Sequence, residues 1–203
     1  MANKPRRLES VCVYCASSNS ARPDYIAAAA AFGAILAREG LRLVYGGGGV
    51  GLMGAVARAA HDGGGRVLGV IPDFLTAHER PLKAVQTVVV HTMHERKMMM
   101  FQEADAFAIL PGGIGTLEEL IELLSWRRLG LHSKPIAFLN IDGFWDPLFA
   151  VFRHILDQHL VPAEFSRTWT TVTHIEDLLP ALRAMPTTVF AGPPGVEEIA
   201  PPP

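Results

Sequence analysis

The sequence predicts a single α/β domain of the Rossmann-like, doubly wound type, in which helices flank a mainly parallel sheet. Two observations lead to this prediction. Short apolar, β-branched runs alternate with helical segments along the chain, as in a series of βαβ units. The runs are also nearly continuous in apolar residues, which is typical of strands that are covered on both faces of a sheet.

Length and composition are consistent with one domain and a short tail. The chain has 203 residues, of which 49% are apolar and 19% charged, which is enough for a substantial buried core. Residues 1–186 are predicted to form the domain. Residues 187–203 follow as a tail rich in proline and glycine, and we expect this tail to be disordered.

In the N-terminal half, glycines mark the ends of the predicted helices. The first helix is expected to end near Gly40, and the second at the three glycines 63–65. The two strands that follow enclose an irregular segment. The predicted ranges are strand 10–16, helix 24–40, strand 41–47, helix 51–65, strand 66–72 and strand 87–92.

In the C-terminal half, prolines act as the main breaks. Pro111 ends the apolar part of one strand, and Pro180 interrupts the last helix or delays its start. The predicted ranges are helix 93–104, strand 106–113, helix 116–130, strand 135–140, helix 146–160, strand 168–173 and helix 175–185.

Charge and hydropathy exclude several classes of protein. The net charge of −2 gives no support for a protein that binds a nucleic acid polymer. No apolar run reaches the roughly 18 residues that a membrane helix needs. The first residues, "MANKPRRLESVCVYCASS", contain neither a long apolar stretch nor a cleavage site of small residues, so we expect a cytoplasmic protein without a signal peptide.

The two cysteines, Cys12 and Cys15, have the C-x-x-C spacing of redox and metal sites. Here the spacing falls in a strand, where an offset of three residues places the sulfurs on opposite faces. We therefore expect two buried free thiols. No metal site is expected, because none of the eight histidines forms H-E-x-x-H or pairs with the cysteines.

Ligands of such folds bind beyond the carboxyl ends of the strands, where the strand order reverses. This rule selects five loops as candidates for a binding site. They are residues 15–20, 45–54, 70–74, 91–97 and 110–116.

The loop 45–54 contains "GVGLMG", which matches G-x-G-x-x-G between a strand and a helix. Asp73, 19 residues beyond the last of these glycines, has about the spacing of a ribose-binding acid. However, the motif follows the second strand rather than the first, and three more glycines precede it. Contact with a nucleotide and a tight, closely packed turn both remain open. The residues of this predicted nucleotide loop are Gly47, Gly48, Gly49, Gly51, Met53 and Gly54.

The loop 110–116, "LPGGIGT", combines three glycines with a threonine at a helix start. Gly112 and Gly113 allow a ligand to approach the backbone, and Gly115 and Thr116 bring N–H groups and a hydroxyl to the positive end of the helix dipole. The alternative is a capping box formed by Thr116 and Glu119. Because a cap alone does not explain three glycines, we favour an anion-binding loop.

The helix after this loop separates apolar and acidic residues. Leu117, Leu120, Ile121 and Leu124 recur at helical spacing and should face the core. Glu118, Glu122 and Ser125 lie on a neighbouring face. Glu119 points about 100° away from Glu118, so the two adjacent glutamates cannot have the same function.

The segment "MHERK" places Arg96 and Lys97 near the start of another helix, where positive charge opposes the helix dipole. A bound phosphate or a carboxylate partner would compensate for this placement. Met98–Met100, which follow, are interpreted as core residues.

Taken together, these motifs resemble the Lonely Guy family of cytokinin-activating phosphoribohydrolases, often mislabelled lysine decarboxylases. The family signature P-G-G-x-G-T-x-x-E is matched at every fixed position by Pro111–Glu119. "MHERK", "YGGGGVGLMG" and "WRRLGLHSKPIAFLNIDGFW" also resemble family segments, and the resemblance covers most of the chain. The decarboxylase label is not supported by the sequence, because its four lysines include none in a recognisable pyridoxal setting.

The resemblance implies hydrolysis of the N-glycosidic bond of adenosine 5′-monophosphate or an N6-substituted derivative. The products would be the free base, a cytokinin or adenine, and ribose 5-phosphate. It implies no cofactor, at least a homodimer, and Arg96 and Glu119 as catalytic residues. An oxocarbenium-like transition state would indeed require a carboxylate near C1′. The substrate-binding positions that the resemblance implies are Glu79, Lys97, Gly112, Gly113, Ile114, Gly115, Thr116, Leu117, Glu118 and Ser125, the last standing where many members have threonine.

Two other functions remain open from the sequence: a non-catalytic nucleotide-binding module, and an NAD(P)-binding enzyme that uses Gly49–Gly54 and Asp73. The presence of both Arg96 and Glu119 favours the hydrolase. The preferred base cannot be read from the sequence. Met53, Met98 and Trp126 are candidates for the wall of its pocket.

Overall fold

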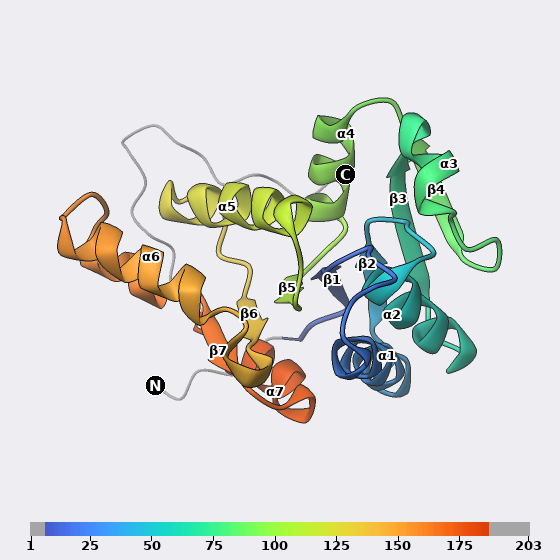
Figure 1. Ribbon diagram of the computed structural model, residues 1–203, viewed down its shortest axis with the longest axis horizontal. Coiled ribbons are helices and arrows are strands. Elements are labelled where there is room, and N and C mark those ends of the chain that lie inside the picture. Colours follow the sequence, from blue (N-terminus) through green and yellow to red (C-terminus); the bar gives the residue numbers. More distant parts are fainter. Residues whose placement is uncertain (1–6, 187–203) are drawn as a thin grey trace.

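The computed structural model describes residues 7–186 and contains one parallel sheet of seven strands (Figure 1). The strand order is β4-β3-β2-β1-β5-β6-β7, and every neighbouring pair is parallel. The predicted tail, residues 187–203, lies outside the described residues. The strands are β1 Ser10–Tyr14, β2 Arg42–Tyr45, β3 Val67–Pro72, β4 Gln86–Val90, β5 Ala106–Ile109, β6 Ile136–Leu139 and β7 Thr170–Val172.

Helices cover both faces of the sheet, so the predicted doubly wound α/β class is confirmed. In Figure 1, α4, α5 and α6 lie on one side of the sheet and α1, α2 and α7 on the other. Each side has its own apolar core, because side chains alternate along the buried strands. The helices are α1 Pro23–Arg38, α2 Gly51–Asp62, α3 Thr76–Glu79, α4 Met93–Gln102, α5 Ile114–Arg128, α6 Asp146–Asp157 and α7 Leu178–Ala184.

The two cysteines illustrate this alternation. Cys12 is buried in the core under α4 and α5, whereas Cys15 belongs to the core under α1 and α2. Both are free, and burial raises the pKa of both thiols. The predicted pair of buried thiols on opposite faces is therefore confirmed. Among residues 7–186, no group of histidine, cysteine, aspartate and glutamate side chains has the arrangement of a metal site.

The strand order reverses between β1 and β5, which are neighbours in the sheet. The loops at the carboxyl ends of these two strands touch, since the backbone N–H of Ala16 donates to the carbonyl of Pro111 at 3.1 Å. This is the position at which doubly wound folds bind their ligands. No helix within the described range is both long and apolar enough to cross a bilayer.

Three details differ from the sequence prediction. Helix α5 begins at Ile114, two residues early, and its N-cap is Gly113 without a side-chain cap. Thr116 thus lies inside the first turn, and the capping box with Glu119 does not form. Ile121 is 46% exposed, and Leu123 takes the predicted place in the core. The buried face of α5 also includes the polar side chains of Thr116, Glu119 and Arg127, so the spacing of the apolar residues alone placed the centre of that face wrongly.

The third difference is the segment predicted as irregular before β4. It contains a 3-10 turn, Asp73–Leu75, and the single-turn helix α3. The carbonyl of Glu79, at the end of α3, accepts a hydrogen bond from the N–H of Gly49 at 2.7 Å. A helix this short depends on such tertiary contacts rather than on its own sequence.

Candidate active site

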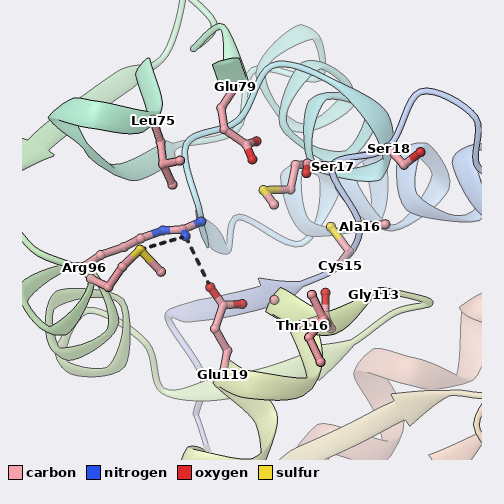
Figure 2. A pocket seen from close by; sticks show the side chains of 14 residues that line it. Cys15, Ala16, Ser17, Ser18, Leu75, Glu79, Arg96, Gly113, Thr116 and Glu119 are labelled. Atoms are coloured by element: carbon pink, nitrogen blue, oxygen red, sulfur yellow. Dashed lines mark hydrogen bonds and ion pairs between the residues drawn. The ribbon is translucent and has the colours of Figure 1, made fainter. Parts of the chain in front are cut away.

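A cavity of about 390 Å³ opens at the reversal of strand order (Figure 2). Its walls come from the loops after β1 and β5 and from α2, α3, α4 and α5. Its volume is in the range of small-molecule sites. It is lined by Cys15, Ala16, Ser17, Ser18, Met53, Leu75, Glu79, Met93, Arg96, Gly113, Ile114, Gly115, Thr116 and Glu119.

Arg96 extends from α4 across the carboxyl ends of the strands. Its Nη2 donates to the carbonyl of Gly46 at 3.1 Å, and its Nε donates to the carbonyl of Val70 at 3.3 Å. Its Nη1 lies 3.7 Å from Oε1 of Glu119. Two backbone carbonyls therefore fix the guanidinium and leave one edge of it facing Glu119 and the cavity (Figure 2).

Glu119 projects from α5 toward the same cavity, where only 7% of the residue is exposed. Burial raises the pKa of its carboxyl group to about 7, although the nearby positive charge of Arg96 acts in the opposite direction. A carboxyl group that titrates near neutral pH is suited to proton transfer.

The start of α4 explains how positive side chains are tolerated there. The N-cap Thr92 accepts a hydrogen bond from the N–H of Glu95, whose carboxylate accepts one from the N–H of His91. Lys97 pairs with Glu118 at 2.5 Å and with Glu122 at 3.0 Å. Carboxylate partners thus compensate for the charge, which was one of the two predicted possibilities. The pairs also join α4 to α5, the helices that carry Arg96 and Glu119.

The loop before α5 presents backbone donors to the cavity. Gly113 is the N-cap, so the N–H groups of Ile114, Gly115 and Thr116 have no partner within the helix. A side chain on Gly112 would meet the hydroxyl of Thr116, which folds back over that glycine. The 15-residue helix α5 therefore directs free N–H groups and its positive dipole end into the cavity.

Glu79 closes the opposite wall, and Figure 2 shows its carboxylate across the cavity from Thr116. Its Oε2 is buried and has no hydrogen-bond partner among the described residues. An unpaired buried acceptor is costly, and this oxygen is available to accept a hydrogen bond from a ligand in the cavity.

The predicted residues are sorted by the structure into two groups. The cavity brings together eight of them: Met53, Glu79, Arg96, Gly113, Ile114, Gly115, Thr116 and Glu119. Several described residues that were predicted to bind substrate are not among its lining residues: Lys97, Gly112, Leu117, Glu118 and Ser125.

Two of these residues line smaller hollows. Gly112 faces a hollow of about 180 Å³ on the α1 side of the loop. Ser125 lines one of about 170 Å³ between α5 and α6, together with Ile121 and Arg128. Ser125 lies nine residues beyond Thr116, roughly 14 Å along the helix.

At the G-x-G-x-x-G motif, other residues of the same chain occupy the place of a ligand. The N–H of Gly51 donates to the side chain of Asn19 at 3.0 Å, and that of Met53 donates to the carbonyl of Ala16 at 3.2 Å. The start of α2 is therefore occupied by the loop after β1, where a dinucleotide would place its pyrophosphate. Asp73 is exposed and pairs with His91 at 3.1 Å. This geometry does not support the NAD(P) alternative.

Sequence reasoning missed six lining residues: Cys15, Ala16, Ser17, Ser18, Leu75 and Met93. The loop after β1 had been selected as a candidate by the reversal rule, and its serines are the signal that could have been used. Leu75 lies in the 3-10 turn that had been predicted as irregular.

Sequence comparisons give a consistent result. Residues 53–182 match a family model described as "Possible lysine decarboxylase". The chain is 40% identical over 183 residues to the cytokinin riboside 5′-monophosphate phosphoribohydrolase LOG2 of Arabidopsis thaliana, covering 90% of this chain and 86% of that protein. It is 50% identical over 145 residues to LOG of Oryza sativa subsp. japonica, covering 71% of this chain and 60% of the rice protein.

Comparison with solved structures supports the fold alone. The molybdenum cofactor carrier protein of Chlamydomonas reinhardtii superposes with a TM-score of 0.67 at 19% identity, covering 88% of this chain and 98% of that chain. A molybdenum cofactor binding protein from Rippkaea orientalis gives 0.65 at 23% identity, with 89% and 96% covered.

Proposed function

Because the chain belongs to the Lonely Guy family of cytokinin riboside 5′-monophosphate phosphoribohydrolases, we propose that it is an N-glycosyl hydrolase of that kind. Its substrates are adenosine 5′-monophosphates, with or without an N6 substituent, and its products are the free base and ribose 5-phosphate. The observation that carries the proposal is the buried pair of Arg96 and Glu119 beside a helix N-terminus that is open to an anion.

The 5′-phosphate binds at the start of α5. Support comes from the free N–H groups of Ile114, Gly115 and Thr116 and from the open space around Gly113 and Gly115. This orientation directs the ribose toward Glu119, which lies one turn further along the helix. The Glu79 carboxylate, on the opposite wall, would repel a phosphate and accepts a hydrogen bond from a ribose hydroxyl or an exocyclic amine instead.

In the hydrolysis, the Glu119 carboxylate stabilises positive charge at C1′ and takes a proton from the attacking water. The water oxygen bonds to C1′ as the bond between C1′ and the purine nitrogen breaks. The purine leaves with the electron pair and takes up a proton, while Glu119 returns its proton to solvent. Arg96 holds the Glu119 carboxylate in place and offers positive charge to the leaving base.

The base lies toward the apolar part of the cavity. Leu75, Met93 and Met53 line it there, whereas the other two candidates from the sequence, Met98 and Trp126, pack against the core under α4 and α5. An apolar lining suits an N6-prenyl substituent, so we infer a preference for N6-prenyladenine nucleotides over AMP.

Three of the residues that do not line the cavity, Lys97, Glu118 and Ser125, have other functions in this proposal. Lys97 and Glu118 join α4 to α5 and so hold Arg96 opposite Glu119. Ser125 is too far along α5 to reach a substrate bound at Thr116 of its own chain. Its hollow includes the exposed Ile121, and we propose that a second copy of the chain covers it in a homodimer. The expected cytoplasmic location stays a prediction.

The test of the reaction is base release. Purified protein is incubated with N6-isopentenyl-AMP and, separately, with AMP, and free base is quantified by chromatography. Glu119→Gln serves as the matched inactive control. Base released by the wild type alone supports the hydrolase, and the ratio of the two rates measures the preference for a prenyl group. Nucleotide binding without base release would instead support a binding module.

A further inference from the structure

The segment 46–50 joins β2 to α2 and contains more glycines than the G-x-G-x-x-G motif requires. Its first glycine lies directly beneath the guanidinium of Arg96. A Cβ atom on Gly46 would lie 2.1 Å from Nη2 of Arg96, well inside van der Waals contact. The carbonyl of the same residue accepts the hydrogen bond from that nitrogen. Gly46 thus both makes room for the guanidinium and holds it.

Gly48 stands in the same relation to Glu79. A Cβ atom there would lie 2.3 Å from Oε2 of Glu79. Cβ positions on both Gly46 and Gly48 would also lie close to Sδ of Met53, at 3.1 Å and 3.3 Å. Two glycines, two residues apart, therefore each lie against one of the charged side chains that line the cavity.

The glycines of the G-x-G-x-x-G motif behave differently. A Cβ atom would meet backbone in each case: the carbonyl of Arg80 at 2.0 Å from Gly49, the backbone of Ser17 at 2.5 Å from Gly51, and the carbonyl of Gly49 at 2.3 Å from Gly54. These three glycines permit close packing of the chain. At Gly46 and Gly48, by contrast, the obstructed atom is at the end of a long side chain rather than in the backbone.

We propose that Gly46 and Gly48 are positioning residues of the hydrolase, which set the places of Arg96 and Glu79 by leaving the space that those side chains fill. The inference rests on the proposed function for its kinetic consequences, but the geometry that it asserts can be measured without any activity. Since side-chain ends can move more easily than backbone, an alanine at either glycine displaces the charged group and leaves the fold intact.

The experiment compares Gly46→Ala, Gly48→Ala and the matched control Gly49→Ala in the full chain. Gly46→Ala is expected to lower kcat for N6-isopentenyl-AMP about 100-fold, as displacements of about 1 Å can do, with KM changed less than threefold. Gly48→Ala is expected to raise KM about tenfold with a smaller effect on kcat. Both should lower Tm by a few degrees at most, in Gly46→Ala through the hydrogen bonds that the displaced guanidinium loses. Gly49→Ala should lower Tm further, because its Cβ meets backbone.

A double-mutant comparison distinguishes displacement of the Glu79 carboxylate from a general loosening of the segment between β2 and α2. With Glu79→Ala as background, Gly48→Ala should raise KM no further, because the displaced carboxylate is already gone. Additive losses would contradict the proposal. A crystal structure of Gly46→Ala gives the direct readout, and we expect the guanidinium of Arg96 to have left the carbonyls of residues 46 and 70.

Failure of the proposed function and failure of this inference are distinguishable. Absence of base release by the wild type would contradict the hydrolase, and the crystal structure of Gly46→Ala would then decide the inference alone. Wild-type kcat in Gly46→Ala, an unmoved Arg96 in its crystal structure, or a fall of Tm to that of Gly49→Ala would each overturn the inference.

Discussion

The guanidinium of Arg96 lies 3.7 Å from the carboxylate of Glu119, and the two side chains are only 6% and 8% exposed. The separation is longer than a hydrogen bond, so the two groups attract each other without being hydrogen-bonded. Because Gly46 and Val70 hold the guanidinium independently, the Glu119 carboxylate keeps its capacity to accept a proton from a third group.

The pH dependence of activity should report the titration of Glu119. Burial raises the pKa of this group to about 7, and the proposed mechanism needs the ionised form. We therefore expect kcat/KM to rise with pH and to reach a plateau above a midpoint near 7. The substrate phosphate also ionises, near pH 6. Glu79→Gln separates the two groups, because it removes one of the negative charges that raise the pKa of Glu119 and should lower the midpoint, whereas a midpoint set by the phosphate would not move. A flat profile between pH 6 and 8 would contradict the assignment.

Replacement of Glu119 should also change how stability depends on pH. The pKa of Glu119 in the folded chain, about 7, is above its ordinary value of 4.5, so folding favours the protonated form. This contribution is fully present below pH 4.5 and is lost as the pH rises through 7. It amounts to about 3 kcal/mol, because one pKa unit corresponds to ~1.4 kcal/mol.

Glu119→Gln resembles the protonated form at every pH. Its Tm relative to the wild type should therefore be several degrees higher at pH 8 than at pH 5, while its activity is lost. Differential scanning calorimetry at the two pH values measures this. A Tm difference that does not change with pH would mean that burial does not penalise the charged carboxylate.

Arg96→Gln tests the other member of the pair. Loss of the guanidinium removes positive charge near the leaving base, and we expect kcat to fall about 100- to 1000-fold. It also removes the charge that lowers the pKa of Glu119, so the midpoint of the residual activity should move above 7. Arg96→Lys keeps a positive charge and is the matched control, with a midpoint nearer that of the wild type. Equal midpoints in the two variants would argue against electrostatic coupling.

Much of the fold was predictable because the five inner strands of the sheet are buried and read as continuous apolar runs. The two edge strands, β4 and β7, are only partly buried, and all seven predicted strands are present. Helix α3 was not predicted, because one turn has no periodicity and depends on the contact between Gly49 and Glu79. The start of α5 was placed two residues late because Thr116 looked like a cap, whereas Gly113 begins the helix without one.

The site was less predictable than the fold. The resemblance to the family implied Arg96 and Glu119 as catalytic residues, but it did not show what fixes them. The hydrogen bonds of Arg96 to Gly46 and Val70 span 50 and 26 residues of sequence and arise only when β2 and β3 lie side by side. Ser17 and Ser18 also reach the cavity through a contact that is distant in sequence, because the reversal of strand order brings the loop after β1 to α5.

Glu79→Gln tests whether the unpaired carboxylate binds the substrate. The variant keeps the shape but loses the negative charge and one acceptor oxygen. We expect KM for N6-isopentenyl-AMP to rise about tenfold with kcat within a few fold, because the hydrogen bond forms in both ground and transition states. Steady-state kinetics give both values. A loss confined to kcat would place Glu79 in the chemistry rather than in binding.

The apolar hollow between α5 and α6 predicts the oligomeric state. Ile121, in the lining of this hollow, is 46% exposed, and Leu124, Phe152 and Ile155 beside it are also apolar. A contiguous apolar patch at the surface is typical of a contact with another protein. Ile121→Glu would bury a charge in that contact, so we expect it to convert a dimer into a monomer with little change in fold. Light scattering coupled to size-exclusion chromatography measures the mass.

Ala34→Glu, on the exposed side of α1 across the sheet, is the control and should stay dimeric. If the dimer also brings Ser125 to the partner's cavity, the monomeric variant will lose affinity for substrate as well as its partner. A monomeric wild type, or an Ile121→Glu dimer, would show that this hollow is not the contact.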